Sequence, residues 1–182
     1  MLKKISPYII EKVTLGGRSA GRDEREKIIR YLEESPEDTV LPLDFSKVTL
    51  IDYSCSDELI CKLVRRVSTG EFERYVVLMG LSDGLKENID MALKFRESAC
   101  IVIEGGQPNI IGDIRPEMKE TYFLAVTMGK ITSKDLVDQG KVEKINAASN
   151  RLTRLQEMGL VCKCREEAIK GGGRQFVYEP VK

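Results

Sequence analysis

Apolar positions in the first half of the chain alternate between strand-like runs and helix-like stripes. Apolar runs of strand length lie within residues 40–51, 75–79 and 100–103. Between the first two runs, Leu59, Leu63 and Val67 recur at the spacing of a helix that buries one face. Because strands and helices alternate along the chain, the pattern predicts a largely parallel or mixed sheet with helices packed on it.

Residues 1–39 add a strand region, a glycine-rich segment and a charged helix. Residues 3–15 alternate loosely between apolar and polar side chains, which predicts one strand or a hairpin. The glycine-rich segment 16–22 leads into a predicted helix over residues 22–34. Backbone amides of such a loop can hold phosphate, but this segment lacks the Gly-Lys-Ser/Thr ending of a nucleotide-binding loop. We therefore favour a tight structural turn and keep the binding of a nucleotide or small anion as the alternative.

A short polar segment, residues 52–57, precedes the first helical stripe. Its Ser and Asp side chains suit a helix start, because their oxygens accept hydrogen bonds from the unpaired N–H groups of the first turn. The sequences LDFSKV (43–48) and IDYS (51–54) resemble the core of STAS domains, the anti-sigma-factor-antagonist-type modules of bacterial partner switching. This resemblance covers about residues 1–104 and implies an α/β STAS-like sheet with packed helices.

The same resemblance implies a regulatory role for Ser54. In antagonists of this type, a partner kinase phosphorylates the serine at this turn, and Asp52 matches the acidic residue before it. Tyr53, Cys55 and Asp57 replace small residues of the usual turn. Phosphorylation would add a charge of roughly −1.5 to −2 and alter the docking of a partner such as a kinase-like ATPase. Two roles stay open: a phosphorylated docking site comprising Asp52, Ser54 and Asp57, or a plain helix cap at Ser54.

Residues 105–116 are rich in turn-forming residues and are predicted to be a linker between two domains. The second domain, residues 117–182, has a different order of elements. The predicted third helix is capped by Asn146 and buries one stripe of apolar side chains. The predicted elements are helices over 117–128, 131–137 and 146–158, followed by strands over 161–165 and 175–178 around a glycine-rich tip.

The sequence AASNRLTRLQEMGLV (147–161) resembles the recognition-helix-to-wing segment of bacterial winged-helix regulators. The resemblance covers about residues 117–181 and implies an α+β winged helix-turn-helix domain whose third helix enters the major groove of double-stranded DNA. Arg can contact guanine, Asn can contact adenine, and Ser or Thr can hold phosphates. A winged helix that binds protein and never meets DNA is the alternative. The implied DNA-binding residues are Asn146, Ala147, Ser149, Asn150, Arg151, Thr153, Arg154, Lys170 and Arg174.

The composition of the chain limits which ligands and reactions are expected. The chain has 29 basic and 29 acidic residues; residues 1–110 carry a net charge of −3 and the remainder +3, which permits a nucleic-acid role for the second half. There is no histidine, and Cys162-x-Cys164 is the only close cysteine pair, so we expect no metal site there but two small residues on one face of a strand. We see no nucleophile–base pair and expect neither catalysis nor a cofactor.

The remaining expectations concern location and assembly. No apolar run approaches the roughly 20 residues that a membrane helix needs, and the N-terminus does not read as a signal peptide. The odd number of cysteines is typical of reduced thiols in a cytoplasm. We therefore expect a cytoplasmic bacterial transcriptional regulator that binds DNA as a homodimer, with the STAS-like domain docking a protein or sensing a signal. The alternative function is a partner-switching module without DNA binding.

Overall fold

A six-stranded sheet organises the N-terminal part of the computed structural model, which describes residues 1–70, 73–168 and 174–182. The strand order is β1-β4-β6-β7-β8, and β2 also pairs with β4. The pairings are parallel except that β8 runs antiparallel to β7. The strands are β1 Lys3–Lys4, β2 Tyr8–Ile9, β4 Thr39–Asp44, β6 Arg74–Met79, β7 Ala99–Glu104 and β8 Gln107–Gly112. The result is the predicted mixed α/β fold with a mainly parallel sheet and packed helices.

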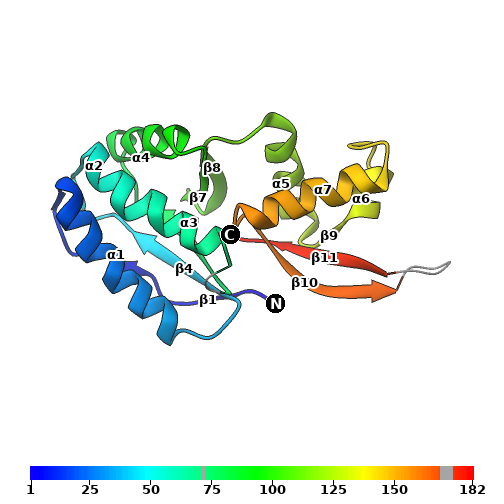
Figure 1. Cartoon of the computed structure of the whole chain (residues 1–182), viewed down its shortest axis with the longest axis horizontal. Helices are drawn as coiled ribbons and strands as arrows, with labels where there is room; N and C mark the ends of the chain where they lie inside the picture. Colours follow the sequence, from blue (N-terminus) through cyan, green and yellow to red (C-terminus); the bar gives the residue numbers. More distant parts are fainter. Residues whose placement is uncertain (71–72, 169–173) are drawn as a thin grey trace.

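Helices cover one face of this sheet (Figure 1). They are α1 Gly17–Glu34, α4 Asp83–Phe95 and a continuous helical stretch made of α2 Tyr53–Ser56, the π-helical segment η1 Asp57–Cys61 and α3 Lys62–Ser68. Leu41, Leu43 and Leu78 point from the strands into this helical layer. A short parallel pair, β3 Thr14–Leu15 with β5 Leu50–Ile51, connects to the starts of α1 and α2.

The C-terminal part has the order helix, strand, helix, helix and two strands. Its elements are α5 Pro116–Met128, β9 Ile131–Thr132, α6 Ser133–Asp138, α7 Ile145–Glu157, β10 Val161–Ala168 and β11 Arg174–Pro180. Strands β10, β11 and β9 form a second, antiparallel sheet. In Figure 1 this part lies to the right of α1–α4. Helix α7 buries Ala148, Leu152 and Leu155, as its periodicity predicts.

The second hydrophobic core joins the two parts. Val40, Val77 and Ile101 alternate with the strand residues of the first core and point to the opposite face of the main sheet, where they join Tyr122 and Leu152 in one cluster. Tyr122 is fully buried there, and its hydroxyl donates a hydrogen bond to the carbonyl oxygen of Val181 at 2.6 Å. The C-terminal helices therefore complete the main sheet by covering its second face.

The predicted linker over residues 105–116 contains a strand of the main sheet, because Gln107–Gly112 forms β8 and pairs with β7. Gly105 and Gly106 both have positive φ and make the tight turn that folds β8 back onto β7. Ile110 and Ile111 are buried on opposite faces of the sheet. Independent folding of residues 1–104 and 117–182 stays a prediction.

Three local predictions near helix starts and strands also need correction. Residues 3–15 form neither one strand nor a hairpin, because β1 and β2 both pair in parallel with β4 and β3 pairs with β5. Helix α1 begins at Gly17, so the predicted glycine-rich loop is largely its first turns. Helix α7 begins at Ile145 after Lys144, which places Asn146 inside the first turn and not at the cap.

Candidate functional site

The polar turn before α2 is held together by one carboxylate. Asp52 caps α2, its Oδ1 accepting a hydrogen bond from the backbone N–H of Cys55 at 2.7 Å. Its Oδ2 accepts a second hydrogen bond, also 2.7 Å, from the N–H of Gly17 at the start of α1. Negative charge is favourable at both places because helix N-termini carry partial positive charge. Asp52 thus ties two helix starts together and occupies an amide that the glycine-rich segment offers to an anion.

Ser54 is the second residue of α2 and lies at a partly exposed position. The prediction that Ser54 is the helix cap is wrong, because the cap is Asp52. Helix capping requires an extended backbone one residue before the helix, and that position falls to Asp52 with φ −87° and ψ 166°. Whether Ser54 is phosphorylated stays a prediction.

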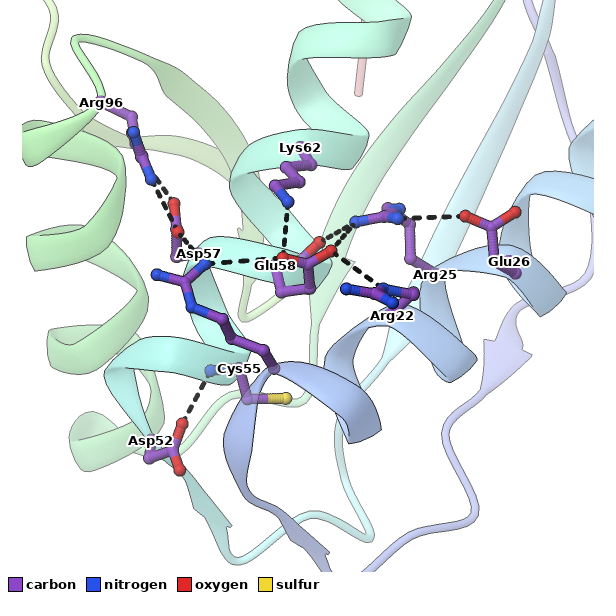
Figure 2. Close-up of polar contacts among 10 residues, drawn as sticks. Arg22, Arg25, Glu26, Asp52, Cys55, Asp57, Glu58, Lys62 and Arg96 are labelled. Atoms are coloured by element: carbon purple, nitrogen blue, oxygen red, sulfur yellow. Dashed lines mark hydrogen bonds and ion pairs between the residues drawn. The ribbon is translucent and has the colours of Figure 1, made fainter.

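Asp57 is buried inside the helical layer and cannot be a surface docking residue as predicted. Its side chain is 1 % exposed and accepts two hydrogen bonds from Arg96, from Nε at 2.6 Å and from Nη2 at 2.8 Å (Figure 2). Arg18 Nη1 adds an ion pair at 3.1 Å. The Arg96 hydrogen bonds, followed by Arg18, lower the pKa of Asp57, so it is charged despite its burial.

Glu58 is the residue that sequence reasoning missed. Its side chain, 2 % exposed, accepts from Lys62 Nζ at 2.6 Å and from Arg25 Nη1 at 2.7 Å, and Arg22 lies 3.8 Å away. Arg25 Nη1 also donates to the backbone carbonyl of Glu58 at 2.7 Å. These contacts, with the Lys62 hydrogen bond the strongest, lower the pKa of Glu58 to about 2. Figure 2 shows Arg22, Arg25 and Lys62 converging on this carboxylate.

The two adjacent carboxylates of η1 reach different neighbouring elements, because successive side chains of a helix point in different directions. Asp57 contacts Arg18 of α1 and Arg96 at the end of α4. Glu58 contacts Arg25 of α1 and Lys62 of α3. A signal was present in the sequence, since Arg18, Arg22 and Arg25 recur at i, i+4 and i+7 on one face of α1.

Large apolar side chains surround the exposed side of the Ser54 turn. Tyr53 and Phe95 are 40 % and 73 % exposed and pack edge to face with their ring centroids 6.2 Å apart. Leu50 and Met91 are also exposed, on β5 and α4, which contact each other. Exposed apolar side chains brought together from three elements favour contact with another molecule.

Helix α7 presents a polar face opposite its buried stripe. Asn146, Ala147 and Asn150 are exposed in its N-terminal half, and Thr153 and Arg154 are exposed further along. Ser149 and Arg151 are partly buried. The exposed set therefore includes most of the helix positions that the sequence predicted for DNA contact.

Two arginines on α7 already have protein partners. Arg151 Nη1 donates to the carbonyl of Lys141 at 3.2 Å and so braces the loop before the helix. Arg154 Nη1 pairs with Glu157 at 3.3 Å, with both side chains exposed. Arg154 also lines a cavity of about 400 Å³. Glu97, which follows α4, and Arg115, which directly precedes α5, line the same cavity. Lys170 lies outside the described residues, and Arg174 begins β11.

The cysteines pack as small residues. All five are free thiols. Cys162 is buried beside Asp38, with Sγ 3.7 Å from Oδ1, and Cys164 is partly buried with Sγ 3.5 Å from Glu179 Oε2. Burial raises the pKa of the Cys164 thiol to about 12. Among the described residues, no group of three or more Cys, Asp or Glu side chains is arranged to hold a metal ion.

Within residues 1–70, 73–168 and 174–182, every helix is too short or too polar to cross a bilayer. No family model, curated protein or solved structure is significantly similar to this chain.

Proposed function

We propose that this protein is a cytoplasmic transcriptional regulator in which α7 binds double-stranded DNA and the N-terminal part docks a protein or senses a signal. The observation that carries the proposal is the amphipathic character of α7. One side of this helix is a buried apolar stripe, and the other is a polar face whose N-terminal residues are exposed. An α-helix with side chains is about 10–12 Å across, and the major groove is about 12 Å wide.

The surroundings of α7 agree with a winged-helix domain. Helix α6 precedes it and packs against it, α5 also contacts it, and the β10–β11 hairpin follows. Thr132 caps α6 in a reciprocal arrangement with Asp135, which fixes where the first helix of the pair begins. Lys134, Lys141 and Lys144 are exposed near the two helices and supply positive charge for phosphates.

The residues of α7 divide by role in this proposal. Asn150 is exposed in the N-terminal half and suits contact with an adenine edge. Arg151 braces the preceding loop through Lys141 and positions the helix. Arg154 sits closer to the N-terminal part and suits a phosphate at the margin of the contact.

A binding selection from random duplexes, followed by mobility shifts at several salt concentrations, tests the proposal. Wild-type protein should enrich a sequence, and its affinity should fall steeply as salt rises. The double change Asn150→Ala and Arg154→Ala should abolish the enrichment. Arg30→Ala, which removes an exposed cation from the distant helix α1, should leave it intact. The proposal fails if wild type enriches no sequence or if the double variant enriches the same one equally well.

The assembly that fits this mode is a homodimer on paired half-sites. Mass measurement in solution, with and without the selected duplex, gives its stoichiometry. A 1:1 complex of one chain with the selected duplex would contradict the dimer while leaving DNA binding by α7 in place.

A second candidate function is a STAS-like partner switch without DNA binding. It is favoured by the exposed apolar side chains of Leu50, Tyr53, Met91 and Phe95 around Ser54, which suit docking of a kinase-like ATPase. Phosphate on Ser54 would place negative charge beside the Asp52 carboxylate and change that docking. Partner capture should then be lost in Phe95→Asp and altered in Ser54→Asp, and retained in the remote control Met128→Asp. Equal capture by all variants would remove this candidate.

A further inference from the structure

Two adjoining cavities lie along the exposed side of α3, and the described residues that line them include neither Ser54 nor a residue of α7. The larger, about 350 Å³, is lined by Arg25, Lys62, Arg65, Arg66 and Thr69. The smaller, about 240 Å³, is lined by Asp57, Cys61, Lys62, Arg65, Arg96 and Ser98. Lys62 and Arg65 line both, so these two side chains form the wall between the cavities. We call the pair of cavities the α3 basic groove.

The charge of this groove is one-sided. Its lining includes Arg25, Lys62, Arg65, Arg66 and Arg96, against Asp57 as the acidic lining residue. The Asp57 carboxylate is buried beneath and already accepts both hydrogen bonds of Arg96. Glu58, which is equally buried, offsets Lys62 and Arg25 from below. Arg18 and Arg22 also pair with these two carboxylates, and Arg25 pairs in addition with Glu26. The cations Arg18, Arg22, Arg25, Lys62, Arg65 and Arg96 therefore outnumber the carboxylates of Glu26, Asp57 and Glu58, and the exposed Arg65 lines both cavities.

The buried carboxylates also fix where the cations stand. Lys62 is held by Glu58 at 2.6 Å, and Arg96 is held by Asp57 through two hydrogen bonds. Both cations remain about half exposed, so each has donors left for a ligand. Binding costs less side-chain entropy when the donors are already ordered. Asp57 and Glu58 thus act as supports that hold a cationic surface in place.

We infer that the α3 basic groove binds a small anion carrying two phosphoryl groups, such as an organic diphosphate. One phosphoryl group lies against Arg96 and Lys62 in the smaller cavity, and the other lies against the exposed Arg65 in the larger. Guanidinium forks match the geometry of phosphate oxygens, and Lys adds a point charge. The larger cavity has room for the remainder of a small organic molecule. This inference is independent of DNA binding by α7.

Calorimetric titration of the full chain with inorganic pyrophosphate tests the inference, at an ionic strength kept constant with sodium chloride. Wild type should show saturable binding with one site per chain, and sodium sulfate should bind more weakly. Arg65→Gln should weaken the affinity about tenfold or more, because a hydrogen bond to a charged group is lost. Arg65→Lys should lie between the two, since it restores the charge without the fork.

The Arg65 substitutions should weaken anion binding without unfolding the protein. The Arg65 side chain is exposed, and the hydrogen bonds it receives from Ser68 and Thr69 go to its backbone oxygen, so the substitutions leave the helix end intact. Arg30→Gln, an exposed cation of α1 that lines neither cavity, is the matched control and should bind pyrophosphate as wild type does.

Three results would overturn the inference. The first is no saturable binding of pyrophosphate by wild type. The second is equal weakening by Arg65→Gln and Arg30→Gln, which would mean a diffuse ionic effect. The third is that Arg65→Gln weakens binding of a DNA duplex while pyrophosphate binds neither protein, which would make the groove a contact for nucleic-acid backbone.

Discussion

The stretch from Asp52 to Glu58 and the helix α7 both display polar residues at the start of a helix, but the structure uses those residues in opposite ways. In the first region the acidic side chains are already engaged, Asp52 by two backbone amides and Glu58 by Lys62 and Arg25. On α7, Asn150 is exposed, and the buried side is purely apolar.

The comparison indicates which polar residues stabilise the fold and which are exposed to bind another molecule. A buried carboxylate is stable only with partners, so its removal leaves uncompensated cations and damages the fold. A helix such as α7 is held in place by its buried apolar stripe. An exposed amide side chain on the opposite face can therefore be removed with little change in the free energy of unfolding. Substitution in the two regions should therefore give opposite combinations of stability and binding.

Among substitutions of polar side chains, the largest effect on stability is expected from Glu58→Ala. Removing this carboxylate leaves Arg25, which is mostly buried, and Lys62 without their shared partner, and the free energy of unfolding should fall by about 2–4 kcal/mol. Urea denaturation followed by circular dichroism measures it. Glu26→Ala is the matched control, because Glu26 pairs with the same Arg25 at 3.1 Å but is half exposed. Its expected cost is below about 1 kcal/mol. Equal costs would contradict the buried-support role.

The pH dependence of stability should come next. The pKa of Glu58 is about 2 in the folded protein against 4.5 for an unperturbed carboxyl, and the pKa of Asp57 is lowered as well. A lowered folded-state pKa gives stability that is full above the unfolded pKa and is lost as pH falls through the folded one. Between about pH 6 and pH 3, the Glu58 contribution to the free energy of unfolding should drop by about 2 kcal/mol.

The Glu58→Ala variant provides the comparison for this pH effect. It lacks the titrating group, so its free energy of unfolding should fall less over the same range than that of wild type. Parallel urea midpoints at each pH measure both proteins. Identical pH profiles would show that Glu58 is not charged and paired in the folded state.

A smaller effect is expected at the helix starts. Asp52→Ala removes the cap of α2 and the partner of the Gly17 amide, and should lower the free energy of unfolding by about 1–2 kcal/mol. Asp52→Asn keeps one carbonyl acceptor and should lose roughly half as much. Ser54→Ala should change stability by less than about 0.5 kcal/mol, because Ser54 is not the cap. A cost at Ser54 equal to that at Asp52 would overturn this assignment.

Local periodicity was sufficient for much of the fold. The runs over 75–79 and 100–103 lie in β6 and β7, and the stripe of Ala148, Leu152 and Leu155 is the buried side of α7, because each pattern depends on residues close in sequence. The run over 40–51 is not one strand but two, β4 and the separate β5, which belong to different sheets. Strands buried on both faces are apolar throughout, however, so their sequence does not say what covers each face. The packing of the C-terminal helices on Val40 and Val77 therefore could not be predicted.

The partners of the buried carboxylates could not be predicted from the sequence for a related reason. Arg96 meets Asp57 across 39 residues, and Arg25 meets Glu58 across 33, so neither pair leaves a short-range pattern. The sequence predicts a polar helix start over 52–57, and α2 confirms it. It does not predict the burial of Asp57, because charged residues are rarely buried. Only the arginine spacing on α1 hinted at an acidic partner, and it did not identify which carboxylate.

The smallest effect on stability, and the sharpest test of the comparison, is expected from Asn150→Ala. Asn150 is exposed on α7, so the free energy of unfolding should change by less than about 0.5 kcal/mol, while Leu152→Ala, two residues along in the buried stripe, should lower it by about 2–5 kcal/mol. Affinity for a duplex selected by wild type should nevertheless fall about tenfold in Asn150→Ala, because a base contact is lost. If instead Asn150→Ala destabilises the protein as Leu152→Ala does, the polar face of α7 is part of the fold, and the contrast with the Asp52–Glu58 region disappears.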